Sequence, residues 1–350
     1  MLDEIFTLSL AAMIALLFHW AFRTLPNEGW QILACLPSIK GQDGRWHGIN
    51  LTYYGFFNAL AVCFAVAIFL ILMGSLEQSA DGTLVIISGI IIICLPASRM
   101  IAALIEKKPH TSSVGAAFFL GIVITPWIIL LTNATLGKSA GFQISPIGAI
   151  TALLIAYAFG EGIGRLACIS FGCCYGKPLA DCGQFIRHLF RKYNFVFYGK
   201  TKKIAYAHQL DGLEVIPIQA LTALLYVSAA ISGLYLFLKG FFYAALILTL
   251  VVTQGWRAFS EFLRADYRGS GRISAYQIMA VAAIIYLALI ASCYSATDIK
   301  IPDLLSGLKF IWDPGIIILL VILWIAVFFY TGRSNVTDSM IDISVINKNI

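Results

Sequence analysis

The chain has 350 residues, of which 60% are hydrophobic and only 12% are charged, and its mean hydropathy is +0.86. Soluble domains have roughly 25% charged and less than half apolar residues, so this composition excludes an ordinary soluble domain. The formal net charge is +6. The apolar runs are continuous rather than alternating, so the sequence predicts membrane-spanning helices and not the strands of a barrel.

In chain order the apolar runs predict nine spans, each near the roughly 20 residues that a bilayer core of about 30 Å requires. They lie near residues 5–22, 53–74, 84–104, 114–132, 146–164, 217–238, 241–258, 273–293 and 314–331. Asp3 and Glu4 precede the first run in place of a basic segment, and no small-residue cleavage pattern follows it. We therefore expect this run to stay attached as a helix.

Two longer polar stretches separate the spans, Arg23 to Asn50 and Lys177 to Ile216. The second is the only connection large enough to form a small extramembrane cap, at about residues 177–216. No internal repeat is visible. The tail after Gly332 is polar and has the composition of a disordered or peripheral end.

Lys and Arg gather in the connections after the first, third, fifth and seventh spans, and the expected cap alone contains Arg187, Arg191, Lys192, Lys200, Lys202 and Lys203. Under the positive-inside rule this side faces the cytoplasm. The alternative is that these charges belong to a site for anionic lipid, in which case they report function and not topology.

The stretch that closes the seventh span contains Arg257, Glu261 and Arg264, spaced four and then three residues apart. If the helix continues through them, they share one face as an Arg–Glu–Arg ladder. A carboxylate between two arginines would hold guanidinium groups that match phosphate oxygens. The alternative is a set of interfacial side chains that only anchors the helix end.

A second polar group follows the fifth span, in the stretch GEGIGRLACISFGCCYGKP. Arg165 ends the apolar run one helical turn after Glu161, so it is a candidate phosphate ligand or a simple helix-end anchor. The glycines of this stretch, including Gly164 and Gly172, permit close backbone approach and a tight exit from the helix.

The same region contains cysteines at positions 168, 173, 174 and 182. Their spacing fits no usual zinc or cluster pattern, so we expect no metal there. A disulfide requires an oxidising compartment, and the adjacent Cys173 and Cys174 are poorly placed to pair with each other. The interpretation that we favour for these cysteines is that of small packing residues.

Two further candidates are His110, a few residues before the fourth span, and Tyr54, at the start of the second. Histidine is the best general base in this chain. The alternatives are a structural histidine and an aromatic-belt tyrosine.

Together these segments resemble the bacterial prolipoprotein diacylglyceryl transferase family. The resemblance rests on TYYGFF, His110 five residues before Gly115, GRLACISFGCCYGKP, Pro217 with Gln219, and RAFSEFLRADYRG. It covers about residues 50–293 and implies an all-α polytopic membrane helical bundle. That bundle has seven family-like spans, one or two extra terminal spans and a small cap. The implied parts are an added span and connection (1–50), a transferase-like core (51–295), and an additional span and tail (296–350).

The resemblance also implies the activity: transfer of the diacylglyceryl group of phosphatidylglycerol to the thiol of the lipobox cysteine of a prolipoprotein, which releases glycerol phosphate. Arg165, Arg257 and Arg264 would hold the lipid phosphate, with Gly164 and Gly172 among the substrate-binding positions. Glu261 would orient the arginines, Tyr54 would place the head group and His110 would accept the proton. The implied partners are phosphatidylglycerol, a lipobox peptide and membrane lipids, with no nucleic acid, metal or cofactor.

The implied location is the bacterial cytoplasmic (inner) membrane with the active face outside, which opposes the positive-inside count. The chain departs from the common family signature at Cys168, Phe171 and Cys173, and Thr222 lies near a position where a glutamate is frequent. These departures affect the acceptor side and leave open a paralogue with another acceptor or a non-catalytic anionic-lipid binder. A transporter would usually show paired halves, and a thiol redox protein would usually show a CxxC pair.

Overall fold

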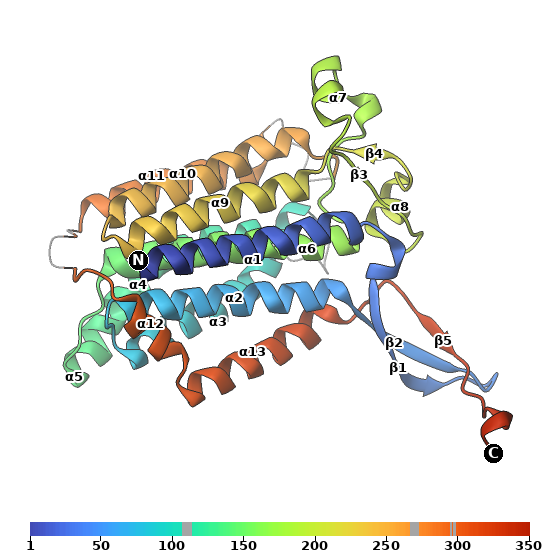
Figure 1. The fold of residues 1–350 in the computed structure, drawn as a ribbon, viewed down its shortest axis with the longest axis horizontal. Coiled ribbons are helices and arrows are strands. Elements are labelled where there is room, and N and C mark those ends of the chain that lie inside the picture. Colours follow the sequence, from blue (N-terminus) through green and yellow to red (C-terminus); the bar gives the residue numbers. More distant parts are fainter. Residues whose placement is uncertain (107–113, 267–272, 295, 297–298) are drawn as a thin grey trace.

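The computed structural model describes residues 1–106, 114–266, 273–294, 296 and 299–350. Within these residues, eight helices are long and apolar enough to cross a membrane. They run side by side as a polytopic helical membrane bundle (Figure 1). These helices are α1 (Leu2–Thr24), α2 (Tyr53–Ser75), α4 (Val114–Thr132), α6 (Pro146–Phe171), α9 (Ile218–Leu238), α10 (Phe242–Ser260), α11 (Ala275–Ser292) and α13 (Pro314–Gly332).

Each of these eight helices coincides with a predicted span. The remaining prediction, at 84–104, falls in α3 (Ala80–Glu106). The apolar part of α3, Ala80–Cys94, is shorter than the eight long helices. A π-helical turn at Asn133–Gly137 extends α4 into the short α5 (Lys138–Ala140). Another short helix, α12 (Leu304–Ile311), precedes α13.

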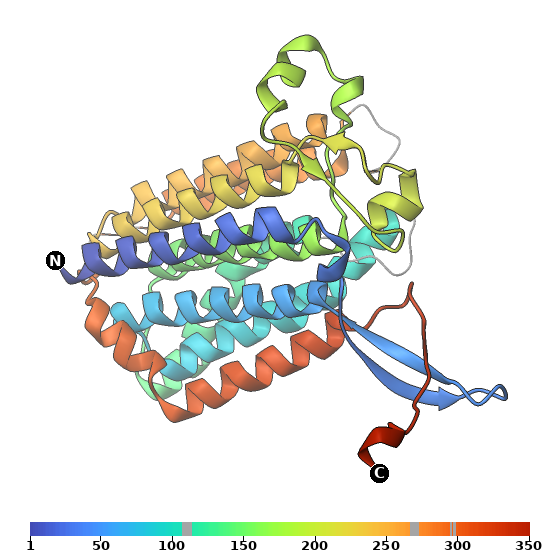
Figure 2. The ribbon, with the colours of Figure 1, turned by 45° about the vertical axis from the view of Figure 1, so that its right-hand side comes forward.

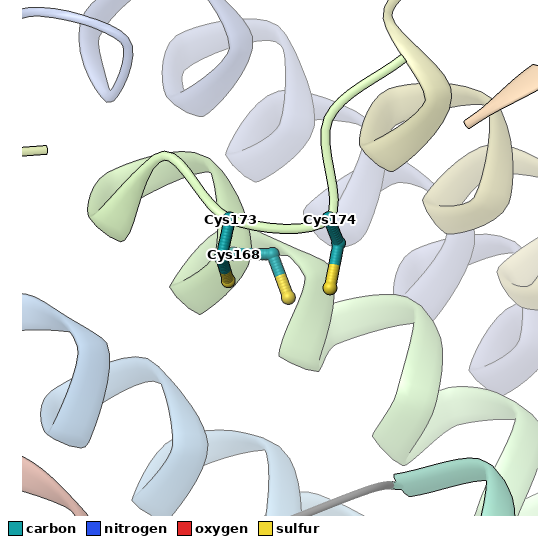
Figure 3. Close-up of side chains that lie close together, drawn as sticks. All are labelled: Cys168, Cys173 and Cys174. Atoms are coloured by element: carbon teal, nitrogen blue, oxygen red, sulfur yellow. The ribbon is translucent and has the colours of Figure 1, made fainter. Parts of the chain in front are cut away.

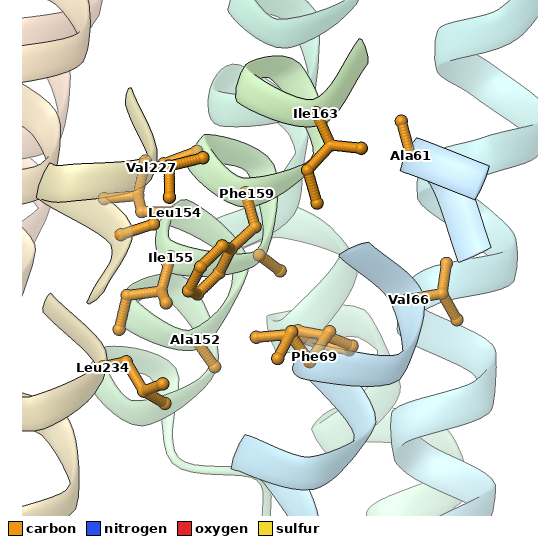
Figure 4. Packing of buried hydrophobic residues seen from close by; sticks show 14 of the residues in the cluster. Ala61, Val66, Phe69, Ala152, Leu154, Ile155, Phe159, Ile163, Val227 and Leu234 are labelled. Carbon is orange, nitrogen blue, oxygen red and sulfur yellow. The ribbon is translucent and has the colours of Figure 1, made fainter. Parts of the chain in front are cut away.

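Helix α6 lies at the centre of the bundle, between α2 and α9 (Figure 4). It begins at Pro146, where the Ser145 hydroxyl accepts a hydrogen bond from the backbone of Gly148, and it ends at the left-handed Gly172. A Cβ on Gly160 would lie 2.9 Å from Ala65 of α2. A Cβ on Gly162 would lie 2.7 Å from Val227 of α9. Small residues therefore allow α6 to approach both neighbours closely.

The cap lies at one end of the bundle (Figures 1 and 2). The cap contains α7 (Gln184–Phe190), α8 (Lys203–His208) and the paired strands β3 (Phe195–Val196) and β4 (Glu214–Val215). Short 3-10 turns lie at Glu28–Trp30, Leu179–Asp181, Glu261–Leu263 and Asn347–Asn349. The two chain ends lie at opposite ends of the bundle (Figure 1).

A three-stranded antiparallel sheet also projects from this end, in the order β1 (Ile32–Lys40), β2 (Trp46–Thr52), β5 (Ser339–Ile341). Of the two alternatives predicted for the tail, disorder is wrong for residues 339–341, because they pair with Trp46, His47 and Gly48. The hairpin was also not predicted. Composition alone does not reveal a three-residue strand that is completed by a partner almost 300 residues earlier in the chain.

The C-terminal helices pack closely on α2 through glycines. A Cβ on Gly55 of α2 would lie 2.2 Å from the Cα of Gly332, and a Cβ on Gly307 would lie 2.2 Å from the carbonyl oxygen of Ile71. The Thr52 hydroxyl, which caps α2, also donates to the carbonyl of Gly332 at 2.9 Å. These contacts fix both α12 and α13 against α2.

Candidate functional site

The most polar part of the bundle interior is a pair of arginines that share one carboxylate. Glu161 and Arg165 lie one turn apart on α6, and Arg257 comes from the last turn of α10. One oxygen of Glu161 accepts from Arg165 and the other accepts from Arg257. The side chains of Glu161, Arg165 and Arg257 are only 2%, 12% and 11% exposed. Two guanidinium groups and one carboxylate give these three side chains one excess positive charge, and the Glu261 carboxylate lies within electrostatic range of Arg257.

Both arginines keep donors that no described residue uses. The Nε atoms of Arg165 and Arg257 are buried, and neither has a hydrogen-bond partner within the described part of the chain. Buried polar groups are nearly always paired, because an unpaired one costs about 1–3 kcal/mol. The excess charge and the unused donors are both properties of an anion-binding site.

Tyr157 completes the row on α6, one turn before Glu161, and its hydroxyl accepts from Nη2 of Arg257 at 2.7 Å. Sequence reasoning did not single out Tyr157. Positions 157, 161 and 165 are spaced i, i+4 and i+8, which places them on one helical face. That spacing was the available signal.

The predicted ladder of Arg257, Glu261 and Arg264 is wrong. Helix α10 ends at Ser260, and Glu261–Leu263 form a 3-10 turn that leaves Arg264 extended. Arg257 pairs with Glu161 instead, and Arg264 makes a two-point ion pair with Asp266, at 2.8 and 2.9 Å. Glu161, from another helix, occupies the bridging place that the sequence assigned to Glu261.

Backbone contacts join the two motif regions at this end of the bundle. The amide of Lys177 donates to Leu263, and the amide of Ala265 donates to Tyr175. Gly176 and Arg264 form the bridge between these bonds. The loop that follows α6 therefore lies directly against the segment that follows α10, although nearly 90 residues separate them in sequence.

Three of the four cysteines of this region come together (Figure 3). The sulfur atoms of Cys168, Cys173 and Cys174 all lie within 4.8 Å of one another. Hydrogen bonds to the thiols of Cys168 and Cys174, together with burial, raise the pKa of Cys173. No disulfide links any of the eight cysteines, all of which lie in described segments. Cys182 lies apart from this group, and its thiol donates to the carbonyl of Pro178.

The remaining sequence candidates have different surroundings. The ring of Tyr54 lies 5.4 Å from that of Phe171, within electrostatic range of the three thiols. Gly164 packs against Ala61 of α2, and Gly172 is the left-handed residue that ends α6, with φ of +67°. These two glycines shape the helix and its exit. His110 lies outside the described residues.

Helix α9 contributes polar side chains that contact the cysteine region and α10. The Nε2 atom of Gln219 donates to the carbonyl of Cys173 at 2.9 Å, and its Oε1 atom is buried with no partner among the described residues. Thr222 accepts from the indole of Trp256 at 2.9 Å. The neutral Thr222 is thus engaged with α10 near the position where the resembling family often has a glutamate.

An apolar cavity of about 190 Å³ adjoins the arginine cluster from the interior of the bundle. Helices α3, α4, α6 and α11 line it, and its wall includes Phe118, Ile122, Leu154 and Leu287. Tyr157 also lines this cavity. Because its hydroxyl contacts Arg257, this residue lies between apolar space and buried charge.

The sequence matches no protein-family model and no curated protein.

Proposed function

We propose that this protein transfers the diacylglyceryl group of phosphatidylglycerol to the thiol of a lipobox cysteine, with release of glycerol phosphate. The observation that best supports the proposal is the buried pair of Arg165 and Arg257 on Glu161, with an excess positive charge and unused Nε donors. Such a cluster suits one phosphodiester, which has a single negative charge and several acceptor oxygens.

The proposed reaction needs charge stabilisation more than it needs a strong acid. A sulfur nucleophile attacks the glycerol carbon and expels a phosphate monoester, on which negative charge develops. Guanidinium groups that are already in position stabilise that charge and lower the barrier. The thiolate is the reactive form of the acceptor, so a base near it assists the attack. His110 is the residue that we propose as this base.

The apolar cavity supports a lipid as the source of the phosphate. It lies within the bundle and shares Tyr157 with the arginine cluster. A phospholipid presents a charged head and an apolar tail at adjacent positions, as this site does. Part of one acyl chain would occupy the cavity, while the phosphate lies at Arg165 and Arg257.

The proposed arrangement follows the family that the sequence resembles. Residues 51–295 would form a core of seven spans, namely the six long helices in this range together with α3, and α1 and α13 would be additions. The cap and the loop that follows α6 and contains Cys173 and Cys174 (the thiol loop) would face the outer side of a bacterial cytoplasmic membrane. Tyr54 lies beside the thiol loop and would place the head group.

A second candidate is a lipid-binding relative that lacks this acceptor chemistry. Cys168 and Cys173 occupy positions where the resembling family commonly has asparagine and glutamate, whereas the arginine cluster is intact. This pattern favours retained anion binding with a changed acceptor.

One assay separates the two candidates. The purified protein is incubated with labelled phosphatidylglycerol and a lipobox peptide, and the products are glycerol phosphate and a thioether-linked diacylglyceryl peptide. Both products together would establish the transferase. Saturable binding of phosphatidylglycerol without either product, beside an active control enzyme, would reject the transferase in favour of the lipid binder.

A further inference from the structure

The three thiols meet because of the way in which α6 ends. The amide of Gly172 donates to the carbonyl of Ile169, and the amide of Cys173 donates to the carbonyl of Cys168. These are the two hydrogen bonds of a Schellman motif. In this motif the residue after the left-handed glycine lies against a residue of the last helical turn. A cysteine occurs at both of the positions that this motif brings together.

The third thiol is held in place by an uncommon backbone conformation. Cys174 has a φ of +56°, in the left-handed region that residues with a side chain seldom adopt. In this conformation its side chain points to the same side as that of Cys173 (Figure 3). Gln219 and the amide of Ile204 bind the carbonyl groups of Cys173 and Gly172, so the loop is fixed on both sides.

This geometry matches the requirements of a thiophilic cation. Zinc binds thiolates at about 2.3 Å, which separates the sulfurs of a tetrahedral site by roughly 3.8 Å. The three sulfurs here lie within 4.8 Å of one another, so small rotations would place all three on one ion. Three protein ligands leave a fourth position open, as in catalytic zinc sites. Cys168 and Cys174 are only half-buried, so a ligand can reach that position.

The surrounding charges suit the complex that would form. Three thiolates and one divalent cation have a net charge of −1. The guanidinium groups of Arg165 and Arg264 and the ammonium group of Lys203 lie within electrostatic range of these thiols. Arg165 and Arg264 are already paired with Glu161 and Asp266, so Lys203 is the nearby cation that would offset the negative charge of the metal centre.

We propose that Cys168, Cys173 and Cys174 bind one Zn²⁺ ion, whose open fourth position takes the sulfur of the acceptor thiol. This replaces the expectation from spacing alone that the cysteines hold no metal. The role of the ion rests on the proposed transferase function, whereas binding of the ion itself does not.

The chemistry balances without a further reactant. In this form of the mechanism the ion takes over the role of the base proposed above: the acceptor thiol loses its proton when its sulfur binds the ion, because a coordinating thiol is deprotonated. That sulfur attacks the glycerol carbon, and the carbon–oxygen bond breaks with its electron pair on the phosphate oxygen. A thioether forms, and the released glycerol phosphate takes up the proton. The zinc site and the arginine cluster would then act on opposite ends of the same displacement.

The first test is metal binding by the full-length protein in detergent. Chelator-treated protein is titrated with Zn²⁺ against a competing chelator, and the metal content is measured after gel filtration. We expect one Zn²⁺ per chain for the wild type and for the matched control Cys182→Ser. Each of Cys168→Ser, Cys173→Ser and Cys174→Ser should bind Zn²⁺ at least tenfold more weakly. Equal affinity in all five proteins, or no binding by the wild type, would overturn the proposal.

A second measurement does not depend on the folding of the variants. Wild-type protein is treated with a thiol-alkylating reagent with and without Zn²⁺, and the labelled peptides are identified by mass spectrometry. Zn²⁺ should protect Cys168, Cys173 and Cys174 together, while the exposed Cys293 is labelled in both samples. Equal labelling of the three thiols, or a disulfide among them with no uptake of metal, would refute the site.

The diacylglyceryl transfer assay then distinguishes binding of Zn²⁺ from a role of Zn²⁺ in the transfer reaction. Loss of transfer on removal of Zn²⁺, with recovery when Zn²⁺ is restored, supports the role as well as the site. Undiminished transfer by metal-free protein would reject the role while leaving the proposed function intact. Stoichiometric Zn²⁺ binding without any transfer would instead reject the proposed function and retain the site.

Discussion

Arg165 and Arg257 depend on the same carboxylate, so the consequences of changing any member of this cluster can be worked out from its charge. With all three present the net charge is +1, and one phosphodiester neutralises it. Removal of an arginine leaves a neutral pair with no electrostatic demand for an anion. Removal of the carboxylate leaves two buried cations that repel each other.

The first prediction concerns the arginines. Arg165→Ala and Arg257→Ala should each lower the rate of diacylglyceryl transfer by about 100-fold or more, as loss of one preorganised donor does at other sites with developing negative charge. Lysine at either position keeps the charge but loses the planar fork, so it should restore little. The measurement is the initial rate with phosphatidylglycerol and a lipobox peptide. Arg191→Ala, on the exposed cap, is the control. Unchanged rates would remove the phosphate-binding assignment.

Glu161→Gln tests the cluster through stability. Loss of the charge from a buried ion pair costs about 3–5 kcal/mol, so the variant should unfold at a lower temperature in detergent. Phosphatidylglycerol should raise the melting temperature of the variant more than that of the wild type, because the lipid supplies the missing negative charge. Zwitterionic phosphatidylcholine is the matched lipid control. Equal effects of the two lipids would contradict the prediction.

Lys202 gives a prediction about pH. Its side chain is fully buried in the cap, and its ammonium group donates to the carbonyls of Leu25 and Ser170 at 3.2 and 2.5 Å. Burial lowers the pKa of this lysine from 10.5 to about 8. Between these two values the unfolded chain holds the proton and the folded protein does not. The contribution of Lys202 to the free energy of unfolding therefore rises as the pH increases from about 8 to 10.5.

The measurement is thermal or denaturant unfolding of the wild type and Lys202→Met from pH 7 to pH 10. The stability difference in favour of the wild type should grow with pH, by up to about 3 kcal/mol. The comparison between the two proteins cancels the titration of the other lysines. A difference that is independent of pH would show that Lys202 titrates alike in both states.

Among the helices, α2 has close interfaces with α12 and α13, because it contacts both through glycines. Gly307→Ala places a methyl group 2.2 Å from the carbonyl oxygen of Ile71, and backbone atoms cannot move aside as a flexible side chain can. We expect a loss of about 1–3 kcal/mol in stability. Protease cleavage near α12 should also become faster.

The matched control is Gly255→Ala in α10, where an added Cβ meets nothing within 4 Å. Alanine is the better helix former, so this change should raise stability by about 0.5–1 kcal/mol. If both variants behave alike, the close approach of α12 to α2 does not hold in solution.

The sequence predicted the presence of the helices well, but it predicted poorly where a helix ends. Eight of the predicted spans are long apolar helices among the described residues, since a run of about 20 apolar residues has few other stable forms in a membrane. The ladder at Arg257, Glu261 and Arg264 required α10 to continue past Ser260. No residue in this segment predicts the 3-10 turn that ends the helix. Extrapolation of a helix by one turn was enough to assign the wrong carboxylate.

The thiol cluster shows a different limit of sequence reasoning. Spacing rules for metal sites derive from loops and hairpins, and positions 168, 173 and 174 match none of them. The positions do match the geometry of a helix that ends at a left-handed glycine. Gly172 was the available signal, because a glycine that directly follows an apolar helix predicts a Schellman turn.

At the scale of the whole molecule, the cap and the three-stranded sheet lie at the same end of the bundle (Figures 1 and 2). We predict that this end lies outside the cell. A membrane-impermeant thiol reagent should label Tyr193→Cys, at an exposed position of the cap, in intact cells. It should label Cys293, which follows α11 at the opposite end, only after permeabilisation. The reverse pattern would place the cap in the cytoplasm.

The pairing of β5 with β2 has a consequence for the order in which the protein is made. Strands β1 and β2 leave the ribosome early, but the third strand is synthesised only after α13, close to 290 residues later. One edge of β2 therefore stays unpaired throughout the insertion of all the intervening helices. The pairing of β5 with β2 is among the last events of assembly, and a chain that terminates before Ser339 would never form it.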